Sequence, residues 1–107
     1  MEQKQLRLIL RALRKELNTV LGKRMEQVIL YGSQARGDAR DDSDIDVLIV
    51  LKDDFKYGAM LKKTSKIVAK ISLDNDVVIS RAFASRQQYE HSQIPFLMNV
   101  RRDGIAI

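Results

Sequence analysis

Apolar residues recur at helical spacing over two long segments, and shorter segments between them are almost continuously apolar. Residues 2–21 and 55–73 carry apolar side chains every three or four positions, so the spacing predicts an amphipathic helix over each. Residues 28–31 and 45–51 are rich in valine, isoleucine and leucine, which is typical of buried strands. A third short strand is expected over residues 77–80.

Two short helices are expected in the last quarter of the chain. Ser85 followed by Gln88 matches a capping box, in which the two side chains satisfy backbone N–H groups of the first turn. Pro95 is favourable in the first turn of a helix, and Gly104 is a usual residue at a helix end. One helix should therefore begin at Ser85, and the last should lie between Pro95 and Gly104.

The order of these elements predicts a mixed sheet. A helix connects the strands 45–51 and 77–80, and such a crossover makes two strands parallel, with a right-handed connection in nearly all cases. The first strand ends at residues 32–33, which reach the beginning of the second strand only if the two are antiparallel. We therefore predict an α/β fold in which residues 1–107 form a single domain, a small mixed sheet flanked by helices.

Composition narrows the class of protein. A length of 107 residues fits one domain. The chain has no cysteine, which excludes disulfides, thiolate catalysis and zinc–thiolate sites. Small secreted domains usually need disulfides, so this composition favours a cytoplasmic protein. No apolar run approaches the roughly 20 residues of a transmembrane helix, so no membrane association is expected.

The charges are unevenly distributed. Nineteen Lys and Arg against fourteen Asp and Glu give a net charge of +5, which indicates an anionic partner such as a nucleotide, a nucleic acid or an acidic protein face. Five acidic residues are nevertheless crowded into nine positions: Asp38, Asp41, Asp42, Asp44 and Asp46. An acidic island in a basic chain requires a cation or a basic neighbour.

Asp44 and Asp46 stand at the start of the second strand. Alternation places both side chains on one face, about 6.6–6.8 Å apart along the strand. Two such carboxylates can share ions spaced about 3.5–4 Å apart, the arrangement used in phosphoryl and nucleotidyl transfer. Oxygen ligands without cysteine favour Mg²⁺ or Mn²⁺ over zinc. Asp76 precedes the parallel strand and would bring a third carboxylate to the same end; Asp74, which has the same parity, is the alternative.

Residues 32–36 are suited to binding phosphate. Gly32 allows the backbone to approach a phosphate closely, and backbone N–H groups with the Ser33 hydroxyl can bind its oxygens. Arg36 is placed to contact a triphosphate oxygen. It could instead neutralise the neighbouring aspartates of the loop.

The segment from Tyr31-Gly-Ser-Gln-Ala-Arg-Gly to Ser43-Asp-Ile-Asp46 resembles the minimal nucleotidyltransferases of the DNA polymerase beta superfamily. Their signature is Gly-Ser, ten residues, then Asp-x-Asp, and residues 34–43 are those ten here. The ending at residues 99–105 resembles the end of the same family more weakly. The resemblance implies a polymerase-beta-type fold and a transferase that depends on NTP and Mg²⁺.

The resemblance also implies roles for individual residues. Asp44 and Asp46 would hold the metal ions, and Asp76 would complete the metal site and act as general base. Gly32 and Ser33 would hold the triphosphate. Many small members of the family resemble antitoxins that transfer AMP from ATP to a tyrosine of a partner HEPN-type ribonuclease toxin. We therefore expect ATP as the substrate and such a toxin as the partner.

Three other interpretations remain open. The chain could be an antitoxin that neutralises its partner by binding alone, or an enzyme that adenylylates a small molecule such as an aminoglycoside. A nucleic-acid binder would use the lysines of the second helix, namely Lys62, Lys63, Lys66 and Lys70. That interpretation is disfavoured because no aromatic side chains are interleaved with those lysines. The sequence does not decide whether the chain forms a homo-oligomer.

Overall fold

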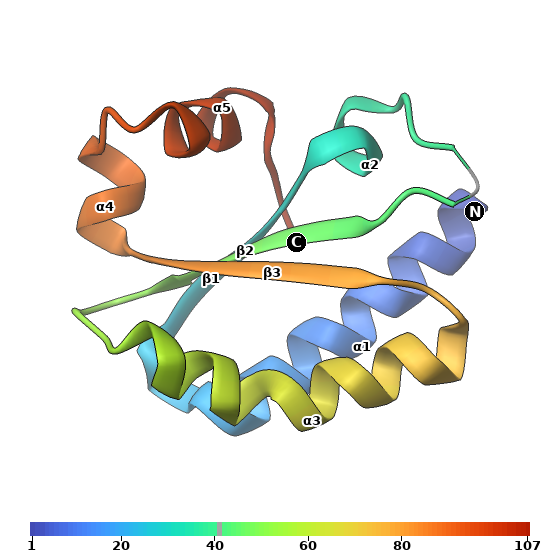
Figure 1. The fold of residues 1–107 in the computed structure, drawn as a ribbon, viewed down its shortest axis with the longest axis horizontal. Coiled ribbons are helices and arrows are strands. Elements are labelled where there is room, and N and C mark those ends of the chain that lie inside the picture. The colour runs from blue at the N-terminus through green and yellow to red at the C-terminus, as the bar shows by residue number, and fades with distance from the viewer. Residues whose placement is uncertain (41) are drawn as a thin grey trace.

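The computed structural model describes residues 1–40 and 42–107. Its helices and strands agree with the predicted order (Figure 1). In chain order they are α1 (Gln3–Leu21), the short 3₁₀ helix η1 (Gly22–Arg24), β1 (Met25–Tyr31), α2 (Gly32–Arg36), β2 (Ile45–Leu51), α3 (Tyr57–Asn75), β3 (Ile79–Ser85), α4 (Arg86–His91), α5 (Pro95–Asp103) and β4 (Ile105–Ala106).

The four strands form one mixed sheet in the order β3-β2-β1-β4. β1 is antiparallel to β2 and to β4, whereas β2 and β3 are parallel, which confirms the predicted mixed sheet. The long helices α1 and α3 lie together on one face of the sheet, and α2, α4 and α5 lie on the other (Figure 1). The end of β1 and the beginning of β2 therefore meet on the side that α2 and α5 only partly cover.

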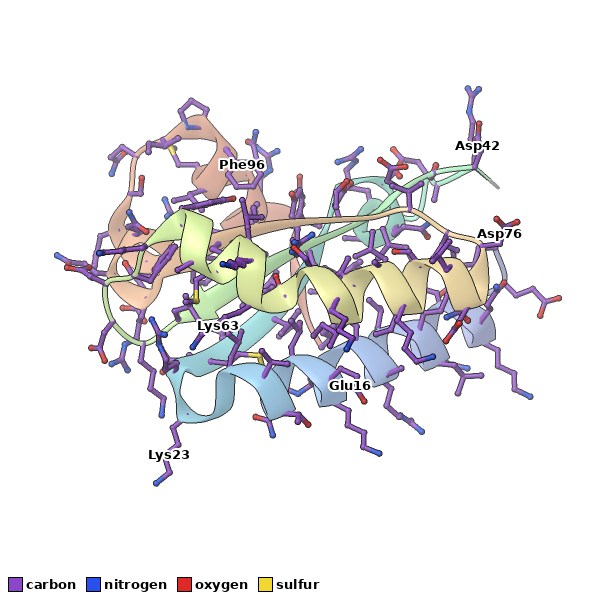
Figure 2. The ribbon with its side chains drawn as sticks, turned by 60° about the horizontal axis from the view of Figure 1, so that its bottom comes forward. Glu16, Lys23, Asp42, Lys63, Asp76 and Phe96 are labelled. Carbon is purple, nitrogen blue, oxygen red and sulfur yellow. The ribbon has the colours of Figure 1, made fainter. Side chains whose placement is uncertain are left out.

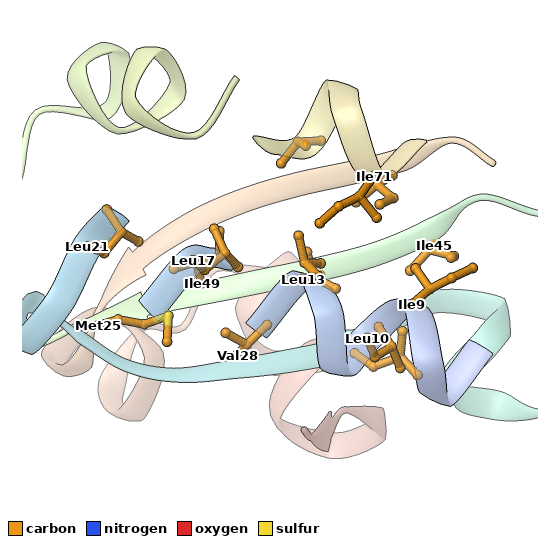
Figure 3. Packing of buried hydrophobic residues seen from close by; sticks show 14 of the residues in the cluster. Ile9, Leu10, Leu13, Leu17, Leu21, Met25, Val28, Ile45, Ile49 and Ile71 are labelled. Atoms are coloured by element: carbon orange, nitrogen blue, oxygen red, sulfur yellow. The ribbon is translucent and has the colours of Figure 1, made fainter. Parts of the chain in front are cut away.

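The larger apolar cluster fills the space between the sheet and the two long helices (Figure 3). Leu13 and Leu17 of α1 are fully buried, and they pack in the same cluster as Val28 of β1 and Ile49 of β2. Burying one such side chain stabilises a fold by about 1.5–3 kcal/mol. The helical repeat of leucines in α1 is thus explained by its contact with the sheet.

Alternation along β2 divides its residues between the two faces of the sheet. Ile45, Val47 and Ile49 belong to the cluster under α1 and α3, whereas Leu48 and Val50 belong to a smaller cluster on the opposite face. That smaller cluster also contains Ile29, Ala84, Leu97 and Val100. Asp46 has the same parity as Leu48, so it belongs to the face that carries α2, α4 and α5.

The third strand differs from its predicted position. It was expected over residues 77–80, but β3 spans Ile79–Ser85. α3 continues to Asn75, and Asp76 ends it in the left-handed region with φ 52°. The chain uses residues 76–78 to turn away from the helix, so the ladder with β2 begins only where Ile79 faces Ile45.

The ends of the last two helices agree with the sequence. Ser85 and Gln88 form the predicted capping box at the start of α4. Pro95 opens α5, and Gly104 follows its last residue. Among the helices of residues 1–40 and 42–107, none combines the length and apolar character needed to cross a bilayer.

α3 is attached to β3 by the hydrogen bonds of one partly buried arginine. The Arg81 guanidinium donates hydrogen bonds to the Thr64 hydroxyl at 2.7 Å, to the Leu61 carbonyl at 3.0 Å and to the Ser65 hydroxyl at 3.2 Å. Thr64 is fully buried. The network therefore fixes the edge strand against the helix that leads into it.

Candidate active site

Asp44 and Asp46 lie at the beginning of β2, as the sequence predicts. Asp46 faces Tyr31 in the antiparallel ladder with β1 and Ser80 in the parallel ladder with β3. Asp46 is partly buried, whereas Asp44 is exposed. Within the described part of the chain, neither carboxylate makes a side-chain hydrogen bond or an ion pair, so both are available to a ligand.

Gly32 lies directly against the Asp46 carboxylate. Its φ of +74° is in the left-handed region, and a methyl group at its Cα would overlap Oδ2 of Asp46. Only glycine satisfies both the backbone conformation and this close approach. The Gly-Ser turn and the Asp-x-Asp strand, which are separated in sequence, therefore form one site.

The surroundings of Asp46 disfavour its charged form. Burial raises its pKa above the usual value and the charge of Asp44 raises it further, while the positive charge of Arg36 partly opposes both effects. Burial also raises the pKa of the Tyr31 hydroxyl to about 12, with further contributions from Asp46 and Tyr57. A cation bound at this position would relieve the repulsion between the two carboxylates.

The segment after β1 folds into the short helix α2. Gly37 ends it in the left-handed region, and the N–H groups of Gly37 and Asp38 both donate to the Ser33 carbonyl. Arg36 Nε lies 3.5 Å from Asp38 Oδ2 in a largely exposed ion pair. Arg36 thus does neutralise a loop aspartate, and it also contributes to the electrostatics of Asp46. Asp41, another member of the acidic island, lies outside the described residues.

Asp76 lies after the last residue of α3, close to the segment that leads into β2. It is the exposed residue that ends α3, and it lines a separate surface cavity of about 260 Å³ with Asp42 and Ser43. Among residues 1–40 and 42–107, no three acidic or histidine side chains form a group that could hold a metal ion. The expectation that Asp76 begins the third strand is wrong, because a left-handed turn at Asp76 ends α3 and β3 begins only at Ile79. Figure 2 shows Asp76 at that end of α3.

Asp74, the alternative third carboxylate, is also placed elsewhere. It accepts a hydrogen bond from Lys70 Nζ at 2.8 Å on the exposed surface of α3. The residue of β3 that faces Asp46 is instead Ser80. Sequence reasoning missed this position because the true register of β3 depends on where α3 ends.

The structure adds residues of α5 to the site. A cavity of about 230 Å³ beside Gly32 is lined by residues of α2 and by Phe96, Asn99 and Asp103 of α5. The ring of Phe96 meets that of Tyr31 edge-on, with centroids 5.3 Å apart. No local sequence pattern identified Phe96 as a site residue, and the weaker family resemblance at residues 99–105 was given no role in the site.

Comparison with known proteins agrees with the predicted fold and family. Residues 7–99 match the model of a family described as "Nucleotidyltransferase domain". A curated protein of Methanocaldococcus jannaschii, named "Putative protein adenylyltransferase MJ0141", is 39% identical over 72 residues. The matched part is 67% of this chain and 72% of that protein.

Two solved structures share the fold. One, described as "Structure of putative minimal nucleotidyltransferase", superposes with a TM-score of 0.67 at 21% identity and covers 100% of this chain and 97% of that one. The other, "Crystal structure of the toxin-antitoxin with AMP-PNP", gives a TM-score of 0.66 at 17% identity over 90% of this chain and 69% of that one. These similarities confirm the predicted fold class.

Proposed function

We propose, since this chain belongs to the nucleotidyltransferase domain family, that it transfers the adenylyl group of ATP to a tyrosine hydroxyl of a partner protein. Its activity is that of a nucleotidyltransferase. The proposal concerns the nucleotide, the acceptor and the biological role. We infer that the partner is a HEPN-type ribonuclease toxin and that this chain is its antitoxin.

The observation that carries the proposal is the contact of the Asp46 carboxylate with Gly32. It joins a pair of carboxylates to a glycine turn at one end of the sheet. Transfer of a nucleotidyl group needs negative ligands for cations and a backbone that a triphosphate can approach closely. Both requirements are met within a few residues of the same contact.

The donor set fits Mg²⁺, with Mn²⁺ as the alternative. Asp44 and Asp46 supply only hard oxygen ligands, and burial, followed by repulsion from Asp44, raises the pKa of Asp46. A divalent cation held there would neutralise negative charge on the bound triphosphate and on the pyrophosphate that leaves, and it would make the acceptor hydroxyl more nucleophilic. Asp76 is outside this proposed site because it lies at the exposed end of α3.

Three residues of the glycine turn would bind the triphosphate. Gly32 leaves open the space beside Asp46 that a side chain would fill. The Ser33 hydroxyl makes no hydrogen bond within the described part of the chain, so it is available to a phosphate oxygen. Arg36 can exchange its exposed 3.5 Å pair with Asp38, which contributes little, for a charge-assisted bond to phosphate.

The proposed reaction is a single displacement at the α-phosphorus of ATP. The phenolic oxygen of the acceptor forms a bond to the α-phosphorus of ATP, and the bond from that phosphorus to the oxygen bridging the β-phosphate breaks. Pyrophosphate leaves, and the proton of the phenol passes to water. The protein contributes mainly by positioning the reactants and by stabilising charge, which is how phosphoryl transfer is generally catalysed.

The known relatives support the identity of acceptor and partner. The curated relative is named a protein adenylyltransferase, which supports a protein acceptor. The solved toxin–antitoxin structure contains AMP-PNP, an ATP analogue, which supports both a toxin partner and ATP.

The decisive experiment mixes this protein with ATP, Mg²⁺ and the product of the adjoining gene, and then measures the mass of that product. The wild-type protein should add one or more AMP units to a tyrosine, and Asp46→Asn should add none while still binding the partner. If the partner is neutralised without any change in mass, and Asp46→Asn protects equally well, the chain acts by binding alone. Adenylylation of an aminoglycoside but never of the protein would establish a small-molecule enzyme instead.

A further inference from the structure

β3 is an edge strand, and part of its outer edge has no partner. Its pairing with β2 begins at the Val78 carbonyl, which accepts a hydrogen bond from the Ile45 N–H at 2.9 Å. From there, every second residue of β3 is hydrogen-bonded to β2. The backbone groups of Ile79 and Arg81 therefore point away from β2. No other hydrogen bond in the described part of the chain uses them. Such a row of unpaired N–H and C=O groups is a template for another strand.

The C-terminal half of this edge is already satisfied by side chains. The Phe83 N–H donates to the Tyr57 hydroxyl at 3.3 Å, and the Ser85 N–H donates to Oε1 of Gln88 at 2.9 Å. These two bonds confirm that odd-numbered residues of β3 face outwards. They also restrict the free part of the edge to the half that leads towards Asp46.

A cleft of about 660 Å³ opens along the same edge. Its floor includes the consecutive residues 82–84 of β3. Because consecutive side chains of a strand point to opposite faces of the sheet, a cleft that touches all three residues must lie along the backbone edge of β3. Phe55 and Tyr57 line one side, and Ile94 and Phe96 line the other. Phe96 projects from α5 on the side of the sheet opposite α3 (Figure 2).

The cleft is exposed, apolar and continuous with the active site. Ile94 is 60% exposed, Tyr57 46% and Phe96 41%, which is unusual for large apolar side chains gathered around one cleft. Phe96 lines both this cleft and the cavity beside Gly32, and its ring touches that of Tyr31. The cleft therefore adjoins the cavity beside Gly32, and Gly32 lies against the Asp46 carboxylate.

We propose that the acceptor protein binds as an extended segment along the free edge of β3, with apolar side chains in this cleft and its tyrosine directed across Ser80 to Asp46. This inference rests on the proposed function, because it places the acceptor of that reaction. The edge of β3 forms main-chain hydrogen bonds with the segment, and the cleft determines which side chains of the segment fit, as in other cases of strand addition.

The width of the sheet explains the choice of tyrosine. Ser80 lies between the outer edge and Asp46 in the register of β2 and β3. Neighbouring strands are about 4.8 Å apart, so a residue paired outside Ser80 has its Cα about two spacings from that of Asp46. The small Ser80 side chain leaves the intervening space to a long acceptor. A serine or threonine of the bound segment would end short of the carboxylates.

The register also predicts where the segment needs an apolar residue. Ala82 is two residues beyond Ser80 on the same face of β3, at the floor of the cleft. Side chains on one face of a strand recur every second residue. An apolar residue two positions from the tyrosine would therefore face the wall formed by Ile94 and Phe96.

Two blocked heptapeptides of identical composition test this register. In Gly-Leu-Ser-Tyr-Ser-Leu-Gly the leucines share a face with the tyrosine, and in Gly-Ser-Leu-Tyr-Leu-Ser-Gly they lie on the opposite face. With ATP and Mg²⁺, mass spectrometry should give at least a tenfold larger kcat/KM for AMP transfer to the first peptide. Equal rates for the two peptides would overturn the inference while leaving the proposed function intact.

Main-chain pairing is tested with two N-methylated forms of the first peptide, one methylated on both serines and one on both leucines. Either the serine N–H groups or the leucine N–H groups of the bound peptide face β3, but not both. One methylated peptide should therefore bind at least tenfold more weakly than the unmethylated peptide, and the other should bind equally well. Fluorescence anisotropy of labelled peptide, without ATP, measures this. Equal losses, or none, would contradict strand addition. Register-dependent binding without AMP transfer would support the docking surface and contradict the proposed function.

A pair of matched variants locates the surface. Ile94→Asp places a charge on the wall of the cleft, and aspartate is a favourable residue at this position, which precedes the first residue of α5. It should abolish the preference between the two peptides. Leu73→Asp, at an 82% exposed position on α3, changes an exposed leucine outside the cleft and should leave the preference unchanged. The reverse result would place the docking surface elsewhere.

Discussion

Tyr31 and Asp46 face each other at the end of the ladder between β1 and β2, next to the glycine that begins α2. Burial, and then the charge of Asp46, raise the pKa of the Tyr31 hydroxyl to about 12. Burial and the charge of Asp44 raise the pKa of Asp46 in turn. An additional negative charge at this point is therefore unfavourable in the folded protein unless a cation accompanies it.

The first prediction follows from the raised pKa of Asp46. A carboxyl group whose pKa is raised by folding destabilises the protein as pH increases from below its usual pKa of 3.8, and the loss of stability is complete above the folded pKa. Asp46→Asn removes this loss, so without ligand it should melt a few degrees higher than wild type at pH 7. The difference should vanish below about pH 3.8.

Thermal denaturation followed by circular dichroism between pH 3 and 7 measures this difference. Asp53→Asn removes the same formal charge from an exposed position and serves as the control. An Asp46→Asn protein that is less stable than wild type at pH 7 would show that the carboxylate is structural.

The second prediction concerns the contact between Gly32 and Asp46. Gly32→Ala combines a positive φ with overlap of the Asp46 carboxylate, whereas Gly37→Ala has a similar φ of +81° but open space around it. The left-handed conformation alone costs a non-glycine residue about 1–2 kcal/mol. Urea denaturation should show a larger loss of stability for Gly32→Ala than for Gly37→Ala. Equal losses would mean that the contact with Asp46 contributes nothing.

The third prediction separates the three aspartates of the predicted metal site. Mg-ATP at a hundredfold excess over its dissociation constant should stabilise the wild-type protein by about 2.7 kcal/mol. Asp44→Asn and Asp46→Asn should each remove most of this stabilisation and abolish transfer. Asp76→Asn should leave both unchanged, and asparagine tolerates the left-handed conformation at that position.

Thermal shift with and without Mg-ATP provides the measurement for all three variants. Loss of the shift in Asp76→Asn would show that the end of α3 rearranges to bring this carboxylate to the nucleotide. An unchanged shift in Asp46→Asn would remove that residue from the nucleotide site.

The fourth prediction tests the network that attaches β3 to α3. Arg81→Met keeps the apolar stem but removes the donor to the buried oxygen of the Thr64 hydroxyl. The expected loss is about 1–3 kcal/mol of unfolding free energy. Lys70→Met removes the exposed pair with Asp74 and should change stability by at most about 0.5 kcal/mol. Comparable effects in urea denaturation would show that the Arg81 bonds contribute no more than a surface pair.

Much of the fold could be predicted because hydrophobic spacing reports burial directly. The leucines of α1 recur at a helical period, and the apolar run of β2 is typical of a buried strand. The crossover through α3 then required β2 and β3 to be parallel. The capping box at Ser85 is likewise a local signal that depends on a few adjacent residues. Local patterns of this kind do not depend on the rest of the chain.

The site was predicted only where it depends on local sequence. Gly32 and Asp46 were expected together because the antiparallel arrangement of β1 and β2 brings the strand ends together. Asp76 was misplaced because the end of α3, and hence the register of β3, depends on a left-handed turn that the apolar run after it does not reveal. Phe96 was missed because α5 reaches the site only through tertiary packing.

The alternation of side chains along β2 affects how this protein can evolve. Ile45, Val47 and Ile49 hold the large cluster together, whereas Asp46 belongs to the opposite face and contributes nothing to that cluster. Substitutions of Ile45, Val47 or Ile49 therefore affect mainly the integrity of the fold, whereas substitutions of Asp46 affect mainly the ligand. A lineage can lose, regain or redirect the chemistry of this face while it keeps an intact scaffold, because no residue of β2 serves both purposes.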